Sequence, residues 1–114
     1  MTEDDSELIH IIRLLSRNTD KEICGFLLGT DEFQVVFPVE NISNRPKTEF
    51  YMDPYGILIA HKLSENLGLN VMGIYHTHIY GPPEPSLKDK DGMKLWPLPW
   101  LIVSQKSHQL VYPE

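Results

Sequence analysis

Three side chains of the kind that bind zinc occur close together in the sequence, at His76, His78 and Asp89. The two histidines follow an apolar run, residues 71–75, that predicts a buried strand. Side chains at positions i and i+2 of a strand point to the same face of its sheet, so both histidines can face one ion. Three such ligands with no fourth nearby leave one coordination position for water, which is typical of a catalytic zinc site. Structural zinc sites are usually closed by four ligands, mostly cysteine.

These residues also have ordinary structural interpretations. A histidine at the end of a strand is usually a half-exposed polar residue, and the histidine pair alone fits that interpretation as well as it fits a metal site. Ser86 and Asp89 form a Ser-x-x-Asp sequence after a proline-rich turn, which predicts a helix start with Ser86 as the N-cap. The capping and ligand roles of Asp89 are compatible, because a helix start is a rigid platform for a ligand.

A zinc hydrolase also needs a base that takes a proton from the attacking water and passes it to the leaving group. Glu22 stands at the start of an apolar stretch, residues 22–29, where its side chain could face a cleft. Alternatively, Glu22 is an ordinary charged residue that lies beside Lys21 and marks the solvated end of a strand. Position alone leaves both interpretations open.

The hydrophobic pattern predicts the elements that must position these residues. Apolar residues recur with helical spacing in residues 6–17. A second helix is predicted to start with Asp53 as N-cap and Pro54 at the first helical position, and to end at Gly68. Strands are predicted at residues 22–29, 33–39, 48–52, 71–76, 100–104 and 109–112, and a third helix at residues 86–95. Because strands and helices are mixed, we expect an α/β fold with a sheet flanked by helices.

The chain as a whole, residues 1–114, has the length of a single domain with one modest core. Its formal net charge of −6 argues against general affinity for nucleic acid or for an anionic membrane. No apolar run has membrane-spanning length, and the acidic start of the chain is not followed by the apolar core of a signal peptide. The single cysteine, Cys24, cannot form an internal disulfide, so we expect it to pack in the core of a cytoplasmic protein.

Taken together, the candidate ligands, the candidate base and the serine between them resemble the JAMM motif of the MPN+ (JAB) metalloproteases. That motif consists of an upstream Glu followed by His-x-His, seven residues, Ser, two residues and Asp, and the same spacing occurs here. The matching positions are Glu22, His76, His78, Ser86 and Asp89. The resemblance extends over roughly residues 6–112 and is to the stand-alone prokaryotic type of this family.

The resemblance implies the MPN fold, a mixed, curved β-sheet flanked by helices and similar to that of cytidine deaminases. It implies one zinc ion per chain, held by His76, His78 and Asp89 with water as the fourth ligand. Glu22 would be the catalytic base, and Ser86 would donate a hydrogen bond to the tetrahedral oxyanion. The reaction implied is hydrolysis of peptide or isopeptide bonds after the C-terminal Gly-Gly of a ubiquitin-like modifier or sulfur-carrier protein of the β-grasp fold.

Two other functions stay open at this point. The zinc site could act on a different substrate, such as a sulfur-carrier adduct or a small amide. Alternatively, the domain could be a non-catalytic MPN scaffold that only binds partners, although such scaffolds typically lack the ligands or the glutamate that this sequence has. Binuclear amidohydrolases also use His-x-His, but their barrels need about 200 residues or more, which this chain lacks.

Overall fold

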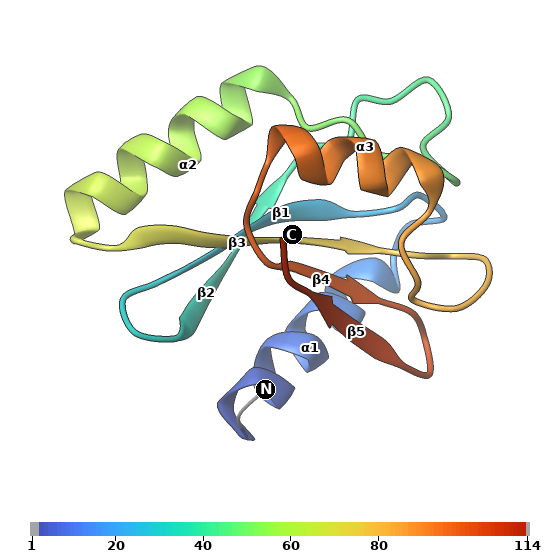
Figure 1. The fold of residues 1–114 in the computed structure, drawn as a ribbon, viewed down its shortest axis with the longest axis horizontal. Helices are drawn as coiled ribbons and strands as arrows, with labels where there is room; N and C mark the ends of the chain where they lie inside the picture. The colour runs from blue at the N-terminus through green and yellow to red at the C-terminus, as the bar shows by residue number, and fades with distance from the viewer. Residues whose placement is uncertain (1–2, 114) are drawn as a thin grey trace.

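The computed structural model describes residues 3–113, which form a five-stranded mixed sheet with helices on both faces (Figure 1). The helices are α1 (Glu3–Ser16), α2 (Pro54–Leu67) and α3 (Leu87–Leu95). The strands are β1 (Cys24–Gly29), β2 (Phe33–Val39), β3 (Asn70–Thr77), β4 (Trp100–Val103) and β5 (His108–Val111). The predicted α/β fold class is therefore confirmed. None of the helices within residues 3–113 has the length and apolar character needed to cross a membrane.

The strand order, β2-β1-β3-β4-β5, brings distant parts of the sequence together. β1 pairs antiparallel with both β2 and β3, whereas β3 pairs parallel with β4. In the β1–β3 register, Cys24 at the start of β1 lies opposite His76 near the end of β3. The residues just before β1 and just after β3 therefore meet at the same end of the sheet.

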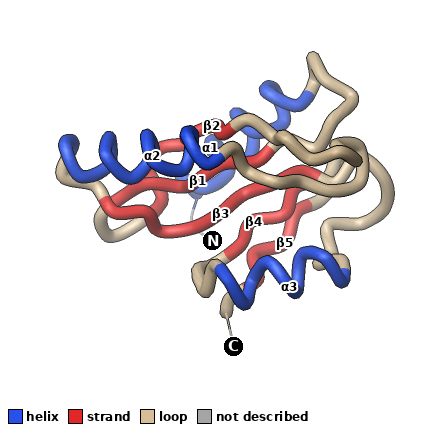
Figure 2. Tube along the Cα trace, turned by 90° about the horizontal axis from the view of Figure 1, so that it is seen from above, coloured by secondary structure: helices blue, strands red, loops and turns tan. Residues whose placement is uncertain are grey.

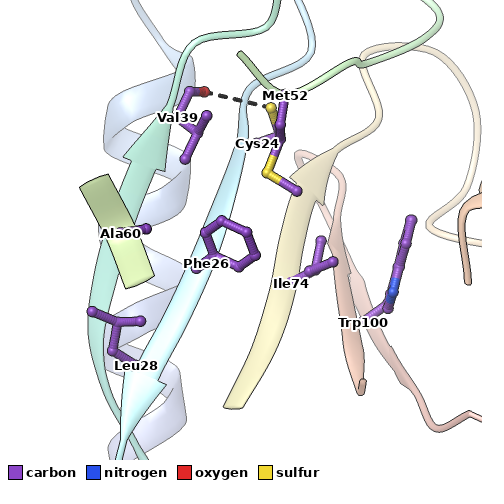
Figure 3. Packing of buried hydrophobic residues seen from close by; sticks show 8 residues of the cluster. All are labelled: Cys24, Phe26, Leu28, Val39, Met52, Ala60, Ile74 and Trp100. Atoms are coloured by element: carbon purple, nitrogen blue, oxygen red, sulfur yellow. Dashed lines mark hydrogen bonds between the residues drawn. The ribbon is translucent and has the colours of Figure 1, made fainter. Parts of the chain in front are cut away.

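Apolar side chains cover both faces of the central strands. The cluster beneath α2 and α3, drawn in Figure 3, contains Cys24, Phe26, Leu28, Val39, Met52, Ala60, Ile74 and Trp100. The cluster beneath α1 contains Ile9, Ile12, Leu27, Tyr75, Leu101 and Val103. Seen from above, α2 lies toward the β1–β2 side of the sheet and α3 toward the β4–β5 side (Figure 2). Every residue of β1 is buried, as expected for a strand covered on both faces.

The ends of α2 follow from local chemistry that the sequence predicts. The Asp53 side chain accepts a hydrogen bond from the Tyr55 N–H at 3.0 Å, and Pro54 is the first residue of the helix. The helix ends at Gly68, whose φ of +69° lies in the left-handed region that favours glycine. The predicted caps of this helix are therefore confirmed.

One predicted strand, residues 48–52, is wrong, and the other boundaries shift by a few residues at most. This segment contributes only an isolated bridge between Asn41 and Met52. The Tyr51 N–H donates to the side chain of Asn41 at 3.0 Å rather than to a neighbouring strand. The alternating apolar residues of the segment place Met52 in the core and leave Phe50 half-buried, so the pattern here reflects burial without a strand ladder.

Candidate metal centre

His76, His78 and Asp89 lie together where β3 ends and α3 begins. The Nε2 atom of His76 is 3.1 Å from Nε2 of His78 and 3.2 Å from Oδ2 of Asp89. The Nε2 atom of His78 is 3.0 Å from the same carboxylate oxygen. His76 and Asp89 are buried, whereas His78 is half-buried. The structure therefore brings the three predicted ligand atoms into a nearly equilateral triangle, which we call the ligand triangle.

The size and chemistry of the ligand triangle fit a zinc ion. Tetrahedral zinc with bonds of about 2.0–2.1 Å holds its ligand atoms about 3.3 Å apart, close to the three separations seen here. The His78 Nδ1 atom is 2.9 Å from the carbonyl oxygen of Pro82, which can only accept, so Nδ1 carries the proton. In the neutral ring, Nε2 then presents a lone pair to the Asp89 carboxylate, and a cation between these two atoms relieves their repulsion.

The surroundings of His76 and Asp89 favour the charge states that metal ligands need. Loss of solvation lowers the pKa of His76, whose ring stacks on Phe50 at 4.6 Å between ring centroids and contacts Trp100 edge-on at 5.6 Å. Burial opposes ionisation of Asp89, but hydrogen bonds to both histidines hold its pKa well below the ordinary value. The hydrogen bond that a protonated Nε2 makes with Asp89 raises the pKa of His78, so this ligand must release that proton when it binds a cation. A neutral His76 and an ionised Asp89 are ready to bind a cation.

On the Nδ1 side of its ring, His76 is held by packing rather than by a hydrogen bond. Its Nδ1 atom is buried and has no hydrogen-bond partner within residues 3–113. The rings of Phe50 and Trp100 therefore support the orientation of this ligand. His78, by contrast, is oriented through the Pro82 carbonyl.

A capping box at the start of α3 holds the Asp89 carboxylate. The Ser86 hydroxyl oxygen accepts from the Asp89 N–H at 3.0 Å, and the Asp89 Oδ2 atom accepts from the Ser86 N–H at 3.0 Å. That same oxygen faces both histidines. The Asp89 side chain thus takes part in the predicted capping box and also has the position of a metal ligand. The helix start holds it in place for both.

Glu22 lies just before β1, at the end of the sheet that carries the ligand triangle. Continuing the register of Cys24 with His76 by two residues places Glu22 opposite His78. Glu22 is only 4% exposed, and desolvation raises the pKa of its side chain from 4.5 to about 8. The nearby charges of His78 and Asp89 act on this pKa in opposite directions. The interpretation of Glu22 as a solvated strand end is therefore wrong.

A model built from prokaryotic homologues of the JAB domain matches residues 5–111 of this sequence. The chain belongs to this prokaryotic JAB family. The resemblance read from the motif is thus confirmed over nearly all of the described chain.

Three relatives of this JAB domain have names that describe an activity. The desampylase of Pyrococcus furiosus is 45% identical over 98 residues, which make up 84% of this chain and 68% of the relative. A probable TtuB-protein conjugate cleaving protease of Thermus thermophilus is 36% identical over 77% of this chain and 59% of its own length. The desampylase of Haloferax volcanii is 29% identical over 82% of this chain and 68% of the relative. The chain thus spans about three fifths to two thirds of these relatives.

Solved structures agree with the JAB assignment at the level of the fold. A protein from Desulfitobacterium hafniense, solved in solution, superimposes with a TM-score of 0.73 and 27% identity over 96% of this chain and 78% of its own. A solution structure from Salinibacter ruber gives a TM-score of 0.68 and 23% identity over 93% of this chain and 78% of its own.

Sequence reasoning missed two groups that support the site of this JAB domain. Thr77, between the two histidines, has a side-chain oxygen that accepts from the Ile23 N–H at 3.0 Å, and its own N–H donates to the Ile23 carbonyl at 3.0 Å. This pair extends the β1–β3 contact toward Glu22. The other group is the Pro82 carbonyl, which accepts a hydrogen bond from Nδ1 of His78. The alternation along β3 indicates that Thr77 faces away from the histidines, but no local pattern identifies the partner of either group.

Proposed function

We propose that this JAB-family protein is a zinc-dependent peptidase that hydrolyses peptide or isopeptide bonds after the C-terminal Gly-Gly of ubiquitin-like or sulfur-carrier proteins of the β-grasp fold. The observation that carries the proposal is the ligand triangle, because it has the donor types and the dimensions of a three-ligand zinc site. The substrate class is supported by two relatives, one named desampylase and one named for cleaving TtuB-protein conjugates.

Each of the motif residues has a role in this proposal. His76, His78 and Asp89 hold one zinc ion per chain. When bound, zinc supplies Lewis acidity toward the attacking water and the scissile carbonyl. Glu22 takes the proton of the water and passes it to the leaving amine. A desolvated carboxylate with a raised pKa is a stronger base than a solvated one, which suits proton transfer near neutral pH.

Ser86 has two roles in the proposal, and both use its hydroxyl group. The oxygen caps α3 by accepting from the Asp89 N–H, as described above. The hydroxyl proton is free of that bond, because the oxygen is the acceptor in it. Ser86 therefore has a donor left for the oxyanion that develops on the scissile carbonyl.

Aspartate in place of Ser86 is expected to give a folded but nearly inactive protein. Aspartate is as good an N-cap as serine, so the loss of about 1 kcal/mol that follows removal of a cap is avoided. Its negative charge faces the developing oxyanion, and loss of the donor alone lowers turnover roughly 10²- to 10³-fold. Thermal unfolding and steady-state kinetics check the two parts. Ser86→Thr, which keeps hydroxyl and cap, is the control, and normal activity in Ser86→Asp would reduce Ser86 to a cap.

The function is tested with modifier fusions that differ at the last glycine. We expect the zinc-loaded protein to cut such a fusion directly after the second Gly of a folded β-grasp modifier, as identified by mass spectrometry of the products. Glycine lets the backbone of the substrate lie close to the backbone of the enzyme, so a valine at this substrate position is expected to prevent cleavage. Cleavage of the valine fusion or of unstructured peptides would indicate a general peptidase. Binding of the modifier without any cleavage would indicate a scaffold.

A further inference from the structure

The side chain of Asn41, just after β2, joins the residue before β1 to the loop that follows Asn41. Its Nδ2 atom donates to the carbonyl oxygen of Glu22 at 2.9 Å and to that of Glu49 at 3.0 Å, and it lies 3.5 Å from the Pro46 carbonyl oxygen. Its Oδ1 atom accepts from the N–H groups of Ser43 and Tyr51, both at 3.0 Å. Both the donor nitrogen and the acceptor oxygen of this side-chain amide are therefore hydrogen-bonded.

The backbone of Glu22 is held on both sides by this arrangement. Its N–H donates to the Pro46 carbonyl at 2.7 Å, and its carbonyl accepts from Asn41. The Glu22 carboxylate has no hydrogen-bond partner within the described residues, 3–113, as befits a group that must accept and release a proton. The place of the carboxylate is therefore set through the backbone of its own residue, and Asn41 supplies one of the two bonds.

The same amide also orders the segment that packs on a proposed ligand. The Glu49 carbonyl and the Tyr51 N–H, both bonded to Asn41, belong to the residues on either side of Phe50. Phe50 stacks on the ring of His76, which has no hydrogen bond at Nδ1. Asn41 thus links the backbone of Glu22 to the backbone on both sides of Phe50.

We propose that Asn41 is a positioning residue for Glu22, an inference that rests on the proposed function. The amide of Asn41 holds the Glu22 backbone at the distance from the ligand triangle at which the carboxylate reaches the attacking water. No other side chain donates to the Glu22 carbonyl within residues 3–113, so loss of the Asn41 donor leaves that carbonyl without a partner.

The test is a double-mutant cycle between Asn41 and Glu22. Asn41→Asp keeps the size and the acceptor of the side chain but removes both donated bonds. Displacement of a catalytic group by about 1 Å lowers the reaction rate on the order of 10²-fold. We therefore expect kcat to fall roughly 10- to 100-fold, with KM and zinc content unchanged. In the Glu22→Gln background the same change is expected to cause no further loss. If Asn41→Asp lowers kcat by the same factor in the wild type and in Glu22→Gln, the proposal is overturned.

Asn44 offers a matched control, because it lies exposed in the same loop and its side chain has no hydrogen bond to any of residues 3–113. Asn44→Asp makes the same chemical change and adds the same charge, and we expect kcat near that of the wild type. If Asn41→Asp does not fold, Asn41→Gln replaces it in the cycle, since it keeps the amide but displaces it by one methylene.

Hydrogen exchange separates failure of this inference from failure of the proposed function. The Glu22 N–H, bonded to Pro46, is expected to exchange faster in Asn41→Asp than in the wild type or in Asn44→Asp. This result does not depend on turnover. Unchanged exchange at Glu22 would overturn the inference even in an active enzyme, whereas a wild-type protein that cleaves nothing would overturn only the proposed function.

Discussion

Glutamine in place of Glu22 is expected to leave the protein folded and zinc-loaded but to lower turnover roughly 10²- to 10⁴-fold, the usual contribution of a general base. The amide has nearly the same shape as the carboxylate and cannot take a proton from water. Steady-state kinetics together with elemental analysis of the same sample check both parts. Glu40→Gln, the same change at an exposed residue after β2, is the control and is expected to act as the wild type. Wild-type turnover in Glu22→Gln would remove Glu22 from the mechanism.

The same variant has an expected effect on stability. The pKa of Glu22 is raised from 4.5 to about 8 by burial. A group whose pKa is higher in the folded state contributes stability that is fully present below the unfolded pKa and is lost as the pH rises through the folded one. In zinc-free protein, the free energy of unfolding of the wild type is therefore expected to fall relative to that of Glu22→Gln as the pH rises from about 4.5 to about 8. Urea unfolding of both proteins across this range measures the difference.

Alanine in place of His76, His78 or Asp89 is expected to reduce the zinc content from about one ion per chain to near zero and to abolish turnover. Each change removes one of three ligand atoms, and the remaining two cannot hold the ion against water. Binding to the folded state alone also stabilises it, so the three variants are expected to lose the increase in melting temperature that zinc gives the wild type. Elemental analysis and thermal unfolding with and without zinc check these effects.

The control for the metal ligands is His10→Ala, because His10 is an exposed histidine on α1, outside the ligand triangle. Its zinc content and melting temperature are expected to equal those of the wild type. Unchanged zinc content in all three ligand variants would show that the ion binds elsewhere or not at all.

Features of the structure that follow from residues close together in the sequence could be predicted. The two histidines share a face because strands alternate, and Asp89 joins them because Ser86 caps the next helix, so short spacings predict where these side chains lie. The α/β class and the caps of α2 follow from local patterns in the same way. The roles of these residues in binding and catalysis stay predictions.

Features that depend on long-range pairing could not be predicted. The pairing of β3 with β1 and β4 and the use of Thr77 to bond Ile23 join segments that no local pattern relates. Residues 48–52 have the alternation of a strand, yet the side chain of Asn41 takes the place of a neighbouring strand for the Tyr51 N–H. A tertiary contact therefore overrides the local preference of this segment.

The pairing of β1 with β3 has a consequence for how the site comes into being during folding. The ligand triangle is contributed by residues 76–89 alone, from the end of β3 to the first turn of α3, whereas Glu22 arrives from a segment more than fifty residues earlier in the chain. A contact between segments so far apart forms only after a large loop has closed, which is slow compared with local structure. A newly made or partly unfolded chain can thus contain the three proposed metal ligands before Glu22, the proposed base, has reached them. Under the proposed function, activity would therefore be limited to molecules whose sheet is complete.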